Sequence, residues 1–108
     1  MRYKTVLVPF PFDDFSQTKV RPAICLTEKI GVYQQVVVAF ITSQIPSDVF
    51  PSDIELEPGS STGLKVKSFL RLHKITTVPH SLIARELGEV SKNKQVEIST
   101  QLKILFNI

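Results

Sequence analysis

Two residues that could act on a phosphate stand two positions apart near the middle of the chain. Arg71 and His73 fall within residues 68–76, which have the composition of a β-strand, so both side chains should project from one face. A guanidinium can bind phosphate through paired hydrogen bonds, and an imidazole can exchange a proton near neutral pH. Together they could cleave RNA without a metal, by assisting attack of a 2′-hydroxyl on its own phosphate. On these two residues alone, the charged outer face of an ordinary strand is the favoured interpretation.

Further polar residues stand where other apolar segments begin or end. Arg21 precedes an apolar segment, and it could bind phosphate or form a surface ion pair with Asp13 or Asp14. Thr42 and Ser43 follow the most apolar run, where their hydroxyls could donate to a phosphate oxygen or cap the strand end. Each of these signals is weak when it is taken alone.

The elements that would position these residues are mostly strands. We expect strands near residues 5–10, 21–27, 36–41, 53–57, 68–76 and 83–90, a polar loop over 11–19 and a turn over 58–63. The run 36–41 is nearly continuous and should be buried on both faces, whereas 53–57 alternates and should have one face in water.

The end of the chain has a different pattern. Ser91 is a suitable N-cap for a helix. Most of the apolar residues after it follow helical spacing, namely Val96, Ile98, Leu102, Leu105 and Phe106. An amphipathic helix there should cover one open end of the sheet. These elements predict a mostly β (α+β) fold, a small, strongly bent antiparallel β-barrel with a C-terminal helix, forming one domain over residues 1–108.

Composition limits the class of protein. The 108 residues are 43% hydrophobic, which suits one folded domain with a core. The net charge of +3 suits a polyanionic partner only weakly. The longest apolar run is far too short for a membrane span, and the run before Pro9 is too short for a signal peptide, so we expect a cytoplasmic protein. A lone Cys25 and the absence of any Cys/His cluster predict a buried thiol, no disulfide, no metal and no cofactor.

Charge is unevenly distributed along the chain. Acidic residues gather at Asp48, Asp53, Glu55 and Glu57, and basic ones follow at Lys65, Lys67, Arg71, His73 and Lys74. Two interpretations are equally acceptable on the sequence: one basic surface beside an acidic one, or solvated faces of unrelated strands.

Four ordered blocks resemble the MazF/PemK toxin family, and together they span nearly the whole chain. They are the valine-rich segment 6–12 with Arg21-Pro22-Ala23 after a polar loop, then Phe40-Ile41-Thr42-Ser43, then Gly63-Leu64 with 68–78, and last Leu87-Gly88-Glu89-Val90-Ser91 before the helix. The resemblance implies an SH3-like barrel and a homodimer that binds single-stranded RNA where the subunits meet. It also implies a cognate antitoxin whose extended, often acidic segment occupies the same groove.

The resemblance also assigns residues. Arg21 looks like the catalytic arginine of the family, Thr42 looks like its hydroxyl partner, and Arg71 falls on an arginine used in the PemK branch. Residues expected to bind RNA are Ser16 and Gln17 in the first loop, with Ser43 and Lys74. Two departures stand out: Tyr3-Lys4 replaces the usual Gly-Asp, and His73 replaces an aspartate proposed as general base. A histidine can also serve as a base.

The first interpretation is therefore the toxin of a type II toxin–antitoxin system, a metal-independent, sequence-specific endoribonuclease that leaves a cyclic phosphate and a 5′-hydroxyl. One alternative is a non-enzymatic, CcdB-like poison that binds DNA gyrase, and another is an inactive RNA-binding homologue. Arg21 and Thr42 favour RNA cleavage, because a protein that only binds gyrase does not need that pair.

Overall fold

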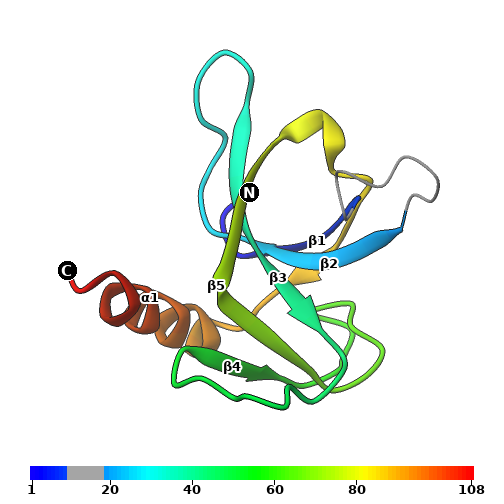
Figure 1. Ribbon diagram of the computed structural model, residues 1–108. Coiled ribbons are helices and arrows are strands. Elements are labelled where there is room, and N and C mark those ends of the chain that lie inside the picture. The colour runs from blue at the N-terminus through cyan, green and yellow to red at the C-terminus, as the bar shows by residue number, and fades with distance from the viewer. Residues whose placement is uncertain (10–18) are drawn as a thin grey trace.

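A computed structural model describes residues 1–9 and 19–108. The strands are β1 (Lys4–Pro9), β2 (Val20–Cys25), β3 (Gln35–Thr42), β4 (Asp53–Leu56), β5 (Ser68–Pro79) and β6 (Arg85–Glu89). A 3₁₀ turn (His80–Leu82) precedes β6, and the helix α1 (Lys92–Phe106) follows it. The strands form one antiparallel sheet in the order β4-β5-β3-β2-β1-β6. The sheet curls strongly, with α1 beside β4 and β5 (Figure 1). The predicted mostly β fold with a C-terminal helix is confirmed.

Two hydrophobic clusters lie on the two faces of the bent sheet. Val36 and Val38 of β3 belong to one cluster, and Ala39 and Ile41 belong to the other. The central strand is therefore buried on both faces, as its continuous apolar run predicts. Cys25 belongs to the first of these clusters, and burial raises the pKa of its thiol to about 11. The thiol is therefore neutral at physiological pH, which agrees with its predicted role as a small core residue.

The strand β5 is longer than predicted and is irregular. Ala39 of β3 faces Ile75, but Ile41, two residues further along β3, faces Leu70, five residues back along β5. The extra residues on β5 form a bulge, and the strand bends sharply at this point (Figure 1). Strict alternation of side chains therefore fails over residues 71–74, which is the part of β5 that carries the candidate site residues.

The helix contacts the sheet through fewer residues than expected. Ser91 is the N-cap, and its Oγ accepts a hydrogen bond from the backbone N–H of Lys94 at 3.4 Å. Ile98 is fully buried and Leu102 packs against the core. The rest of the predicted apolar face is largely open, because Val96, Leu105 and Phe106 are 66%, 36% and 58% exposed. The predicted helix is therefore present and packs against the sheet, but only the middle of α1 meets the core.

Two glycines let the connection before β5 approach β6 closely. Gly63 has a φ of 73°, and a Cβ there would overlap the backbone of Leu87. A Cβ at Gly88 would overlap the backbone carbonyl of Ser61. The N–H of Glu89 donates to that same carbonyl at 2.7 Å. This turn is therefore fixed directly against β6, where it forms one wall of a surface cleft.

Candidate active site

The candidate site opens where β2 and β3 separate. Their pairing ends at Ala23 and Phe40. If the same register continued, Arg21 would lie opposite Thr42, two residues further along each strand. Pro22 lies between Arg21 and the last paired residue and has no N–H with which to continue the ladder. The two residues predicted to be catalytic partners thus come to the two sides of one opening.

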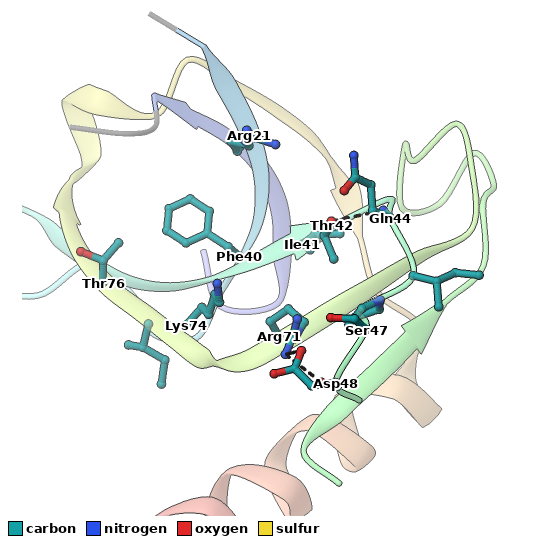
Figure 2. A pocket seen from close by; sticks show the side chains of 13 residues that line it. Arg21, Phe40, Ile41, Thr42, Gln44, Ser47, Asp48, Arg71, Lys74 and Thr76 are labelled. Atoms are coloured by element: carbon teal, nitrogen blue, oxygen red, sulfur yellow. Dashed lines mark hydrogen bonds and ion pairs between the residues drawn. The ribbon is translucent and has the colours of Figure 1, made fainter. Parts of the chain in front are cut away.

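This opening is a cleft of about 750 Å³ between β2, β3, β5 and the connection that follows β3. Figure 2 shows Arg21 at one side, Thr42 and Gln44 at the end of β3, and Arg71 with Lys74 on β5. A second cleft of about 490 Å³ adjoins it, and it shares Arg21, Thr42 and Gln44 with the first. Arg21 forms no ion pair with a carboxylate of the described residues. As far as the described residues are concerned, its guanidinium is available for an anion at the point where the clefts meet.

Among the residues that the structure describes, no acceptor takes the hydroxyl proton of Thr42. Its Oγ1 accepts the backbone N–H of Gln44 at 3.2 Å, so the strand-end role allowed by the sequence is present. This bond uses an oxygen lone pair and leaves the O–H free to donate. Gln44 also lines both clefts, with an amide that can donate or accept. Gln44 was not predicted as a site residue, because nothing in the neighbouring sequence distinguishes it from an ordinary loop residue.

Arg71 is anchored by a buried carboxylate. Its Nε donates to Oδ1 of Asp53 at 2.8 Å, and its Nη2 donates to the backbone carbonyl of Asp48 at 3.3 Å. The Asp53 side chain is 1% exposed, and the N–H of Phe50 donates to its other oxygen at 2.9 Å. A buried carboxylate is costly unless it is paired in this way. Asp53 therefore holds Arg71 at the wall of the cleft. This contact is not evident from the sequence, because it depends on β4 pairing with β5.

His73 lies on the same side of β5 as Arg71, as predicted. Its Nδ1 is 3.9 Å from the same Asp53 oxygen, and its ring meets that of Phe50 edge to face at 4.8 Å. It is not among the described residues that line either cleft, so the structure does not bring it together with Arg21 and Thr42. A general-base role for His73 stays a prediction.

The other predicted RNA-binding residues divide in three ways. Lys74 lines the first cleft together with Arg71, which the irregular course of β5 allows. Ser43 lines the second cleft. Ser16 and Gln17 lie outside the described residues, as do the two aspartates that could pair with Arg21.

The acidic and basic blocks of the sequence meet each other in the fold. Because β4 and β5 pair antiparallel, Lys67 forms an ion pair with Glu55, and Arg71 forms one with Asp53. The interpretation as faces of unrelated strands is therefore wrong, because β4 and β5 are neighbours in the sheet. The interpretation as one basic surface beside an acidic one fails for these two pairs, because each cation is neutralised by its own carboxylate. Lys65 and Lys74 form no ion pair within the described part of the chain.

Neither a metal centre nor a membrane span is evident in residues 1–9 and 19–108. They contain no group of three or more His, Cys, Asp or Glu side chains placed to hold a metal ion. In the same residues, no helix has the length and apolar character needed to cross a bilayer.

Comparison with known proteins shows the family of this chain. The family model described as PemK-like, MazF-like toxin of type II toxin-antitoxin system matches residues 1–106. The chain belongs to this toxin family. A probable endoribonuclease MazF of Mycolicibacterium smegmatis is 32% identical to this PemK/MazF-like chain over 72 residues. The match includes 67% of this chain, and it spans only 64% of the length of that relative.

Solved structures of other proteins have the same fold as this PemK/MazF-like chain. An endoribonuclease in complex with its cognate antitoxin, from a mycobacterial species, superposes with a TM-score of 0.75 at 14% identity, covering 100% of this chain and 95% of that one. The toxin MazF-mt6 of Mycobacterium tuberculosis gives a TM-score of 0.70 at 19% identity, covering 95% and 97%. These matches agree with the curled sheet and C-terminal helix described above.

Proposed function

We propose that this toxin is a metal-independent endoribonuclease that cleaves single-stranded RNA in the cleft between β2 and β3. The observation that carries the proposal is the placement of Arg21 and Thr42 on opposite sides of one opening, with the Arg21 guanidinium free of any described carboxylate. Membership of the PemK/MazF-like family supports the same substrate class. A protein that acted only by binding gyrase would not require this pair.

The chemistry is an internal displacement at phosphorus. The 2′-hydroxyl loses its proton and attacks the adjacent phosphate, the bond from phosphorus to the 5′ oxygen breaks, and the leaving oxygen takes up a proton. The products are a cyclic phosphate and a 5′-hydroxyl. Charge on the phosphate rises in the transition state, so fixed N–H and O–H donors from Arg21 and Thr42 stabilise that state more than the substrate. Asp53 keeps Arg71 in place as a further cation on the wall of the cleft.

Cleavage of a long RNA in excess EDTA tests the proposed function. We expect the same rate with and without the chelator, because the proposed stabilisation comes from protein donors. Activity that disappears in EDTA and returns with a divalent ion would contradict the mechanism. Binding of RNA without cleavage would favour the inactive homologue, and inhibition of DNA gyrase without cleavage would favour the CcdB-like alternative.

His73→Ala tests the predicted general base. Because His73 lies outside both clefts and beside Asp53, we expect only a few-fold loss of rate and an unchanged pH profile. If the neutral imidazole were the base, the wild-type rate would rise as the imidazole loses its proton with increasing pH. The variant would then lose this rise and about 10²–10⁴ in rate. Initial rates from acidic to mildly alkaline pH distinguish the two results.

We infer a cytoplasmic protein that forms a homodimer and is inhibited by a cognate antitoxin. The antitoxin is expected to cover Arg21 and the part of β5 around Arg71, and an acidic segment bound there should lose affinity as salt increases. Titration of the antitoxin at several salt concentrations checks this charge complementarity, and an affinity that is independent of salt would contradict it.

Light scattering at micromolar concentration checks the homodimer. A monomer that still cleaves RNA at that concentration would contradict it.

A further inference from the structure

The second cleft carries two cations that the proposed mechanism does not use. Lys65, from the connection before β5, and Arg85, at the start of β6, both line this cleft and are exposed. Arg21 lies at its junction with the first cleft. The two cations are 20 residues apart in sequence, so only the folded chain brings them to the same concave surface.

The electrostatics of this cleft differ from those around Arg71. None of the described residues that line it is an aspartate or a glutamate, and neither Lys65 nor Arg85 forms an ion pair with a described carboxylate. By contrast, Lys67 is paired with Glu55, and Arg71 is paired with Asp53. Unpaired cations around a concave surface concentrate positive potential there, and such a surface attracts polyanions.

The part of the chain that carries Lys65 is also held in place. The neighbouring Leu64 is buried, its N–H donates to Oγ1 of Thr62 at 3.3 Å, and its carbonyl accepts the N–H of Gly59 at 3.1 Å. The same turn is fixed to β6 by the close approach at Gly63 and by the hydrogen bond from Glu89. Its position relative to β6, the strand that begins with Arg85, is therefore set before any ligand binds, which lowers the entropy cost of binding.

We propose that the second cleft binds the backbone phosphates of nucleotides that flank the cleaved phosphate on one side, with Lys65 and Arg85 as the phosphate-binding residues. This proposal rests on the proposed RNA substrate. The two clefts are continuous at Arg21 and Thr42, so one RNA strand can pass from one cleft to the other. Apolar lining residues such as Val66 and Leu87 offer surface to the sugars. Phosphate contacts of this kind position the strand without reading its sequence.

The test measures binding separately from cleavage. The probe is a fluorescent 2′-O-methyl RNA strand of about twelve nucleotides, which cannot be cleaved because it has no free 2′-hydroxyl. Lys65→Ala and Arg85→Ala should each weaken binding several-fold. Each should also reduce the slope of log affinity against log salt by about 0.7, the value for one lost phosphate contact on a single strand. Neither substitution should affect a 2′-O-methyl dinucleotide, which is too short to enter the second cleft while occupying the first.

Lys103→Ala provides the matched control, since it removes one exposed cation from the far end of α1. Unchanged affinity and slope in both cleft variants, relative to this control, would overturn the proposal. Equal losses on the dinucleotide and the long strand would also overturn it. Lost binding of an acidic peptide with unchanged RNA binding would assign the cleft to a protein partner instead. A different outcome is that the 2′-O-methyl RNA shows the expected salt slopes in every variant while unmodified RNA is not cleaved by the wild type. That result would contradict the proposed function and leave this inference intact.

Discussion

Replacing Arg21 with alanine should lower the rate of RNA cleavage by about 10²–10³-fold while the protein remains folded. The guanidinium stands at the junction of the two clefts, on the opposite side of the opening from Thr42, and no described carboxylate neutralises it. Removing a fixed hydrogen-bond donor from a site where negative charge develops lowers the rate by this factor in comparable reactions. Arg21 is exposed at the start of β2, so its loss leaves the hydrophobic clusters unchanged.

Single-turnover rates on a long RNA, with circular dichroism to verify the fold, measure this effect. Arg21→Lys should recover only part of the activity, because a lysine keeps the charge and loses the planar pair of donors. Lys103→Ala, which removes a cation from α1, should cleave at the wild-type rate. Wild-type cleavage by a folded Arg21→Ala variant would refute the assignment of the site as a whole.

Replacing Asp53 with alanine should lower the free energy of unfolding by about 3–5 kcal/mol. The Asp53 carboxylate is 1% exposed, accepts from Arg71 and Phe50, and holds β4, β5 and the connection before β4 together. Without it, the Arg71 guanidinium stays largely buried, with 11% of its side chain exposed, and has lost its nearest anion. The carboxylate of Asp48 remains 3.9 Å from Nη2 of Arg71, but its side chain is 68% exposed and it neutralises the guanidinium less well. Weakening the pairing of a buried charge is among the most destabilising changes that one substitution can make.

Chemical denaturation at neutral pH measures this loss, and Glu55→Ala is the matched control. Glu55 lies two residues further along β4 and pairs with Lys67, but both side chains are about half exposed, so its loss should lower the free energy of unfolding far less. The double variant Asp53→Ala/Arg71→Ala should lower the free energy of unfolding by clearly less than the two single variants do in sum, since it leaves neither charge unpaired. Equal effects of Asp53→Ala and Glu55→Ala would show that the buried pair contributes no more than a surface one.

Local patterns of the sequence determined most of the secondary structure. The apolar run over 36–41 became β3, the alternation around Ile54 became β4, and Ser91 caps α1. Each of these predictions depends on backbone preference and on the burial period of neighbouring residues, which a short window already contains. The ordered motifs in turn identified the family, because Arg21 and Thr42 stand beside recognisable strand ends.

Only the tertiary structure decided which side chains meet. Antiparallel pairing of β4 with β5 placed Asp53 against Arg71 and so neutralised charges that look separate in the sequence. The bulge in β5 put Lys74 in the cleft, whereas His73 lies outside it, which regular strand alternation does not predict. The second cleft exists because the turn at Gly63 packs onto β6. Register, bulges and close backbone approaches depend on residues far apart in the chain, so a local pattern cannot specify them.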